Sequence, residues 1–189
     1  MERFVTYLLV VIDPNSNLIS IVNAGHMPPI VRRATDGSLI EPGEEESGLP
    51  IAIDEGMEYE VTTCPFRQGD LAVLYTDGVN EAMDADDEEW GIEPLREIVQ
   101  NTIALPDTGD VAALIVKQKI VKDVYQHIGN ADQFDDMCMV IIERTDSVDE
   151  PRTDLSETVD VDNDKTAADV TDLSDNFDIK DKTKLNDTI

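Results

Sequence analysis

An α+β fold is what the order of apolar patterns along these 189 residues predicts. Short segments rich in β-branched and aromatic residues fill the first 75 positions. Two stretches with helical spacing follow, and one more strand-like segment ends near residue 142. From residue 145 the sequence turns to Asp, Ser, Thr and Lys without a period. We therefore expect one domain over residues 1–144 and a disordered acidic tail over residues 145–189.

The first elements are expected to be two hairpins. Residues 4–12 are β-branched and aromatic, and they stop at the Pro- and Asn-containing turn of residues 13–17. Residues 18–23 then read as a second strand, which predicts an antiparallel pair joined by a longer loop. Another extended segment, residues 30–33, ends at Asp36-Gly37, where a second hairpin is expected.

The middle of the sequence predicts a loop and two strands. Residues 41–56 are rich in Glu, Gly and Pro and have no period, which is typical of a loop. Residues 57–64 alternate with period two, as a half-buried strand does. Residues 71–75 are continuously apolar, so they are expected to form a buried central strand.

Helices are expected next. Residues 92–103 carry apolar side chains at helical spacing. A second helix is expected to start from a cap at Asp107 or Thr108 and to run to about His127. Residues 137–142 then read as a last buried strand.

Composition excludes several classes of partner. The formal net charge is -28, which repels nucleic-acid phosphates and anionic membrane surfaces. We expect no nucleic-acid partner, and no apolar run within this chain is long enough to cross a bilayer. Cys64 and Cys138, the two cysteines, form no disulfide framework and no zinc motif, which favours a cytoplasmic location.

Three segments carry the residue types of a functional site: Asn23-Ala-Gly-His-Met-Pro28, the run from Gly69 to Ala82, and Phe134-Asp-Asp-Met-Cys-Met-Val140. Each is weak evidence alone. An Asp-Gly pair after a strand is usually a turn, two adjacent aspartates are usually a solvated loop, and a single histidine is more often structural than catalytic.

In their order and spacing, however, these segments closely resemble the SpoIIE-type serine/threonine phosphatases of the metal-dependent protein phosphatase superfamily. The family has a Phe-x-Thr strand, matched by Phe4 and Thr6, and a strand that ends in Asn-Ala-Gly-His-x-Pro. A Thr-Asp-Gly-Val-x-Glu-Ala element and a paired Asp before the last strand follow, as they do here. The resemblance covers residues 1–144 and implies the C-terminal portion of a four-layer α/β/β/α sandwich with mainly antiparallel sheets.

The resemblance also implies a metal site. Asp77 matches an aspartate that binds a divalent metal, Asp135 matches a second ligand of the same ion, and Asp136 stands beside it as a possible substitute. His26 and Gly78 are expected to support these loops. Carboxylates suit the hard ions Mn²⁺ and Mg²⁺, and the complete family domain holds two of them. Such a pair, about 4 Å apart, activates a water for attack on phosphorus.

The sequence departs from the family pattern in two places. Cys138 replaces a threonine, in a strand position where it is not expected to be a ligand. More importantly, the family has a Gly-Asp-x-x-Asp element on an earlier strand, whose aspartate bridges both metals, and this chain contains no equivalent. We therefore expect a partial domain that lacks N-terminal strands and is a poor catalyst alone.

By resemblance, the function is metal-dependent hydrolysis of phosphoserine or phosphothreonine on a regulatory protein. The partner would be of the anti-sigma-factor antagonist type, within bacterial signalling. The alternative is a non-catalytic, phosphatase-like module that binds a partner protein. The missing bridging aspartate favours the module, whereas Asp77 and Asp135 favour descent from an active enzyme.

Overall fold

The computed structural model describes residues 3–102, 111–133 and 135–145. The chain divides into two units, residues 1–148 and residues 149–189, and only the first contains described residues. The tail expected from residue 145 onward lies outside the described residues except for Thr145. The elements follow in the order β1 (Tyr7–Asp13), β2 (Leu18–Ala24), β3 (Ile30–Arg32), β4 (Leu39–Ile40), β5 (Thr62–Pro65), β6 (Leu71–Tyr75), α1 (Asp77–Asn80), α2 (Ile92–Asn101), α3 (Ala112–Ile128) and β7 (Met139–Glu143).

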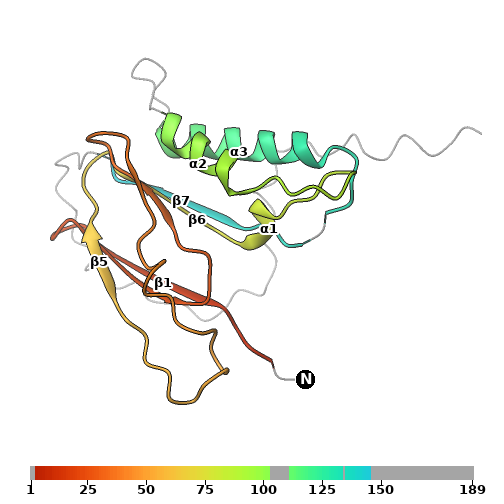
Figure 1. Cartoon of the computed structure of the whole chain (residues 1–189). Helices are drawn as coiled ribbons and strands as arrows, with labels where there is room; N and C mark the ends of the chain where they lie inside the picture. Colours follow the sequence, from red (N-terminus) through yellow and green to blue (C-terminus); the bar gives the residue numbers. More distant parts are fainter. Residues whose placement is uncertain (1–2, 103–110, 134, 146–189) are drawn as a thin grey trace, which may run out of the picture. The chain divides into compact units, whose positions relative to one another are not determined.

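Two antiparallel sheets contain all these strands. One has the order β1-β2-β5 and the other the order β4-β3-β6-β7. Both expected hairpins are confirmed, because β1 pairs with β2 and β3 pairs with β4. The α+β class with antiparallel sheets is therefore confirmed as well (Figure 1).

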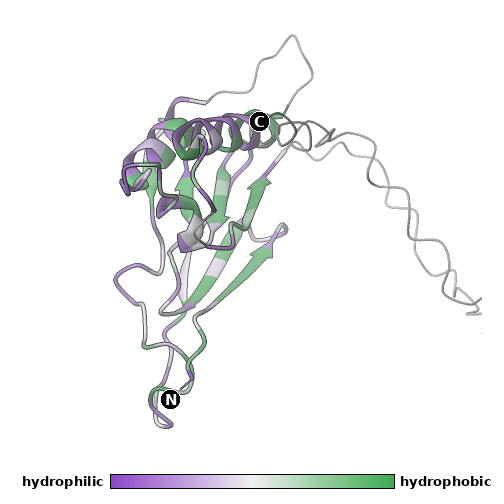
Figure 2. Ribbon diagram, turned by 90° about the vertical axis from the view of Figure 1, so that its right-hand side faces the viewer, coloured by the Kyte–Doolittle hydropathy of each residue, from purple (hydrophilic) through white to green (hydrophobic). Residues whose placement is uncertain are grey.

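Strand β6 is central because its two faces bury different cores. Leu71, Val73 and Tyr75 lie in one cluster with buried residues of α2 and α3, such as Leu95 and Val116. Ala72 lies between Leu71 and Val73 and faces the opposite side of the strand. It belongs to a second cluster together with Ile19, Ile21, Val31 and Phe66. Helices, four-stranded sheet and three-stranded sheet thus stack as three consecutive layers (Figure 1). Figure 2 shows the consequence in colour: the strands are largely hydrophobic, whereas the helices carry both polar and apolar faces.

The core between the two sheets is less covered on the side of β1. This strand is an edge strand, since β2 is its only partner among the described residues. Its inward-facing side chains Leu8, Val10 and Ile12 are only partly buried, although they pack against the second cluster. Its outward-facing side chains Tyr7, Leu9 and Val11 are 42–53% exposed.

Two expectations need correction. The alternating segment 57–64 forms a strand only at β5, because β2 offers pairing partners to residues 62–65 alone. Farther back, Met57 and Tyr59 lie against Gly48 in the loop and make no ladder. The last strand is not fully buried, because β7 pairs only with β6 among the described residues, and its Val140 is 50% exposed.

Both expected helices are present, with small differences in their bounds. The first, α2, ends at Asn101, two residues earlier than expected. The second, α3, begins at Ala112 with Val111 as its N-cap. Asp107 and Thr108, the expected caps, lie outside the described residues. No helix in the described ranges is long and apolar enough to cross a membrane.

Candidate metal centre

The candidate site forms where β6 ends and α1 begins. Thr76 separates the two elements and is the N-cap of α1, so Asp77 occupies the first turn of this short helix. An isolated Asp-Gly pair after a strand is usually a simple turn, but here the Val79 N–H donates to the Thr76 carbonyl at 3.0 Å and the Glu81 N–H donates to the Asp77 carbonyl at 2.8 Å. The chain therefore changes from strand to helix directly at the aspartate.

The segment before β7 is attached to this junction by hydrogen bonds from Thr76. Its N–H donates to the Cys138 carbonyl at 3.0 Å. Its hydroxyl donates to the Asp136 carbonyl at 2.9 Å and accepts a bond from the Cys138 N–H, also at 2.9 Å. The two segments that carry Asp77 and Asp135-Asp136 are thus side by side, as expected from the sequence.

Gly78 permits the close approach of these segments. A Cβ atom at this position would lie 2.7 Å from the Asp136 carbonyl oxygen and 3.3 Å from the Asp135 Cβ. No such distance is found between real Cβ atoms and backbone oxygens, so a side chain here would push the Asp135-Asp136 turn away. The supporting role expected for Gly78 agrees with this geometry.

The three aspartates differ from the buried Asp70, because no cationic side chain among the described residues pairs with them. Asp77, Asp135 and Asp136 are exposed, and no ion pair in the described part of the chain involves them. Asp77 Oδ1 accepts the Gly78 N–H at 2.9 Å, and Asp135 Oδ1 accepts the Asp136 N–H at 2.7 Å. Adjacent carboxylates that have no cationic side chain as a partner in the described residues, and that lie on two closely packed segments, suit a hard divalent ion.

The site is nevertheless incomplete within the described residues. No group of three or more His, Cys, Asp or Glu side chains in residues 3–102, 111–133 and 135–145 is arranged to hold a metal ion. The described part of the chain therefore offers adjacent acidic segments but not a full ligand set.

His26 lies on a loop that is organised by a buried asparagine. Asn23 is 2% exposed, and its amide donates to the carbonyls of His26 and Gly43 at 2.9 and 3.0 Å. Its side-chain oxygen accepts the His26 N–H at 2.8 Å. Gly25 has φ +68 and would place a Cβ 2.6 Å from a Pro50 side-chain carbon, so the tight turn requires glycine.

The structure brings His26 to a cavity and not to the carboxylates. The His26 ring bonds through Nδ1 to the Met27 carbonyl at 2.9 Å. Together with Thr76, Cys138 and edge residues of β1 and β7, it lines a cavity of about 270 Å³ between the two sheets. Asp77, Asp135 and Asp136 are not among the lining residues. His26 thus lies near the junction that carries the acids, but its position does not indicate that it acts together with them.

Tyr75, just before the junction, is held in an apolar and acidic surrounding. Burial raises the pKa of the Tyr75 phenol to about 12, and the nearby Glu41 carboxylate adds to this effect. Glu41 itself accepts two bonds from the Arg96 guanidinium of α2, at 2.7 and 3.0 Å. These bonds raise the pKa of Arg96 and tie the 41–44 loop to the helix layer.

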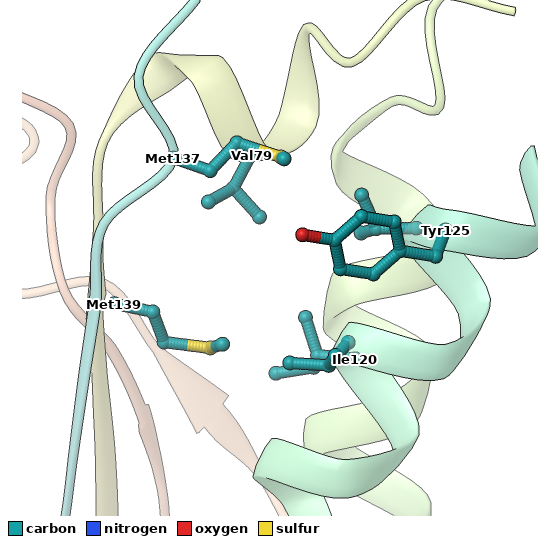
Figure 3. A pocket seen from close by; sticks show the side chains of 7 residues that line it. Val79, Ile120, Tyr125, Met137 and Met139 are labelled. Carbon is teal, nitrogen blue, oxygen red and sulfur yellow. The ribbon is translucent and has the colours of Figure 1, made fainter. Parts of the chain in front are cut away.

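An apolar pocket of about 180 Å³ adjoins the same junction (Figure 3). Figure 3 shows Val79 from α1, Met137 and Met139 from the segment of β7, and Ile120 and Tyr125 from α3 around it. No carboxylate lines this pocket, so the hydrolytic chemistry expected for the chain does not belong there.

A family profile decides the classification. The profile described as Stage II sporulation protein E (SpoIIE) matches residues 1–145. The chain belongs to the SpoIIE family. This match confirms the resemblance drawn from the Asn-Ala-Gly-His, Thr-Asp-Gly and Asp-Asp segments, and it ends one residue beyond the boundary expected from the sequence.

Three similar proteins are each longer than this SpoIIE-family chain. Protein IcfG of Synechocystis sp. is 27% identical over 145 residues, which are 76% of this chain and 21% of that protein. The phosphatase domain of SpoIIE from Bacillus subtilis superposes with a TM-score of 0.52 at 17% identity, over 75% of this chain and 59% of the other. The RsbU and RsbW domains of a Mycobacterium tuberculosis protein give a TM-score of 0.52 at 20% identity, over 74% and 36%. These structures share the fold, and the chain spans about three fifths or less of each relative's length.

The roles of two residues that flank β6 escaped the sequence analysis. Thr76 was noted only as part of the Thr-Asp-Gly segment, yet its hydroxyl joins the two acidic segments. Asp70 was noted only beside Gly69, yet it is buried and bonded to three donors. Position within a motif was the available signal for both, but residue type alone could not separate their roles.

Proposed function

We propose that this SpoIIE-family chain takes part in metal-dependent hydrolysis of phosphoserine or phosphothreonine on a regulatory protein. The observation that supports the proposal is the junction of Thr76 and Gly78 with residues 135–138, because it keeps Asp77 beside Asp135-Asp136. In this proposal Asp77 and Asp135 are ligands of one divalent ion, and Asp136 is a neighbouring acid that can replace Asp135.

Mn²⁺ or Mg²⁺ is the proposed cofactor. A bound pair of such ions supplies a polarised phosphoryl oxygen and a water of lowered pKa. The residues of this chain supply exposed carboxylates without a cationic partner in the described ranges, which fits oxygen-preferring ions. The Bacillus subtilis SpoIIE phosphatase domain has also been crystallised after presoaking with manganese, which supports the choice of metal by analogy.

The substrate class is proposed from the family. We infer a phosphorylated regulatory protein of the anti-sigma-factor antagonist type and a bacterial signalling pathway in the cytoplasm. The likeness to a chain that carries an RsbU domain together with an RsbW domain supports a partner of this type. The net charge of -28 favours a docking surface on the partner that is less acidic than this chain.

A non-catalytic binding module is the second candidate. It is favoured by the lack of a group of three metal-binding side chains among the described residues. The two candidates differ in how they respond to an added strand that carries a further metal-binding aspartate. An enzyme domain gains turnover when a strand with Gly-Asp-x-x-Asp is joined to it, whereas a module gains none.

The experiment compares the present chain with a longer chain that adds such a strand from a SpoIIE-family relative. The longer chain should hydrolyse a phosphoserine protein only with Mn²⁺ or Mg²⁺, and the present chain should show little turnover. In the longer chain, Asp77→Asn should lower turnover by roughly two orders of magnitude or more, because it removes a ligand charge and keeps the shape.

Two matched variants make the result specific. Asp13→Asn changes an exposed aspartate that accepts turn bonds in the same manner, from Asn15 and Ser16, and should leave turnover unchanged. His26→Ala should lower turnover less than Asp77→Asn, because His26 is assigned to support the loop. Hydrolysis that does not need metal would contradict the two-ion proposal. Full activity of the present chain would show that another acid completes the site.

A further inference from the structure

Every polar group of Thr76 has a partner of its own. The N–H donates to the Cys138 carbonyl at 3.0 Å, and the carbonyl accepts the Val79 N–H at 3.0 Å. The hydroxyl accepts the Cys138 N–H at 2.9 Å and donates to the Asp136 carbonyl at 2.9 Å. The hydroxyl therefore has no donor left for another ligand.

This arrangement lets a side chain replace a backbone group in the sheet. The β6–β7 register ends at Tyr75 opposite Met139, so Thr76 is next opposite Cys138. In an antiparallel ladder, the two residues of a hydrogen-bonded pair exchange both N–H···O=C bonds, and the bond from the Thr76 N–H to the Cys138 carbonyl is one of the two. Here the Thr76 carbonyl has turned toward α1, and the Thr76 hydroxyl accepts the Cys138 N–H in its place. Pairing with the β7 segment thus continues beyond the end of β6, up to the N-cap residue of helix α1.

A second observation converges on the same backbone group. The Asp136 carbonyl that accepts the Thr76 hydroxyl also lies 2.7 Å from the position that a Cβ of Gly78 would take. One contact is an attraction and the other is a steric limit. Together they fix the distance between the first turn of α1, which carries Asp77, and the Asp135-Asp136 turn.

We propose that Thr76 is the positioning residue of the metal site: its hydroxyl holds the Asp135-Asp136 turn at the separation from Asp77 that binds a divalent ion. The inference rests on the proposed function, since it assumes that these acids bind metal. Thr76 is not a ligand in it. A residue with a structural role alone would change the stability of the fold and leave the metal affinity of the folded molecules unchanged.

The test measures Mn²⁺ affinity at the site by the paramagnetic broadening of the Gly78 amide signal in NMR spectra of the full chain. A residue-specific signal is needed because the net charge of -28 gives Mn²⁺ many weak binding positions. Thr76→Val should weaken binding about 10-fold or more, as is typical for groups that orient metal ligands. Thr76→Ser keeps the hydroxyl and should stay within about twofold, by the same reasoning.

The matched control is Thr63→Val. Thr63 lies in β5, in the other sheet, and its hydroxyl bonds to Ser20 at 2.9 Å. The same chemical change there should leave the broadening of Gly78 unchanged. Unaltered Mn²⁺ affinity in Thr76→Val, or equal weakening in Thr76→Ser, overturns the inference while leaving the proposed function in place.

A measurement on the parent chain makes the test independent of how the variants fold. By linkage, a hydroxyl bridge that favours metal binding must itself be favoured by the metal. Saturating Mg²⁺ should therefore slow hydrogen exchange of the Cys138 amide, which donates to Thr76, and unchanged exchange overturns the inference. Gly78 broadening that is insensitive to Asp77→Asn in the parent chain contradicts the metal site, and with it the proposed function.

Discussion

Asp70 and Asp77 lie at opposite ends of β6 and have opposite surroundings. Asp70 is 2% exposed and accepts bonds from the Ala34 and Arg67 N–H groups at 2.8 and 2.9 Å. The Arg33 guanidinium completes its surroundings at 3.1 Å. Asp77 is exposed, and in the described part of the chain its side chain accepts one N–H, from Gly78, and forms no ion pair.

The comparison separates two uses of one residue type on one strand. At the Asp70 end, the protein supplies both the hydrogen bonds and the positive charge, so the carboxylate stabilises the fold. At the Asp77 end, no cationic side chain of the described residues pairs with the carboxylate, so it can bind a cation from solution. Burial with a full set of donors therefore marks a structural acid, and exposure beside further acids marks a candidate ligand.

The largest expected effect on stability is at the buried end. Asp70→Asn should lower the free energy of unfolding by about 3 kcal/mol, because it removes the charge that pairs with Arg33 and points an amide N–H₂ at backbone donors. Urea denaturation at pH 7 measures this loss.

Asp77→Asn is the matched substitution at the exposed end. It should change the free energy of unfolding by no more than about 0.5 kcal/mol, the scale of surface substitutions. Similar losses for both variants would abolish the distinction between the two ends of β6.

A loss of stability smaller than that of Asp70→Asn, but larger than that of Asp77→Asn, is expected from Gly78→Ala. The new Cβ would meet the Asp136 carbonyl at 2.7 Å, so the turn must move, at a cost of about 2 kcal/mol. Gly56→Ala is the control, because its Cβ would meet nothing closer than an Asp54 side-chain oxygen at 3.6 Å. Thermal denaturation of both variants compares them, and an equally mild effect of the two would show that the junction tolerates a side chain.

The smallest effect at neutral pH is expected from Tyr75→Phe, at the last residue of β6. Because the pKa of Tyr75 is about 12 in the fold and about 10 when unfolded, its protonated form stabilises the fold fully below pH 10. This contribution is lost as the pH rises from 10 to 12. Tyr75→Phe should therefore flatten the decline in stability over that range, measured by urea denaturation at several pH values. An unchanged alkaline decline would mean that Tyr75 is not the group responsible.

Much of the sheet framework follows from local patterns. The apolar run 71–75 predicted a strand that is buried on both faces, and turn residues predicted both hairpins. The period-two pattern of residues 57–61 predicted a strand that is not there, because side chains that cover a loop can alternate in the same way as those that cover a sheet. Burial of β7 was overestimated, because an apolar run does not show whether a strand has a neighbour on each side.

For the candidate site, the sequence predicted which segments meet but not how they are joined. The order of the motifs placed Asp77 near Asp135-Asp136, and the hydrogen bonds of Thr76 agree with this. That a hydroxyl would replace a carbonyl could not be predicted, because it depends on the direction the chain takes into α1. The contrast between Asp70 and Asp77 could not be predicted either, because it depends on hydrogen-bond donors that are distant from Asp70 in the sequence.

The position of β6 between β3 and β7 also has a consequence for the time course of biosynthesis. As the ribosome makes the chain from its N-terminus, β3 can pair with β6 while α2 and α3 are still being made. Residues 135–138 and β7 emerge only afterwards. Until then Tyr75 cannot pair with Met139, its partner in the β6–β7 register. The junction that carries the acids therefore cannot form until the strands β1 to β6 and the helices α1 to α3 have been synthesised, so a divalent cation can bind there only late in the synthesis of the domain.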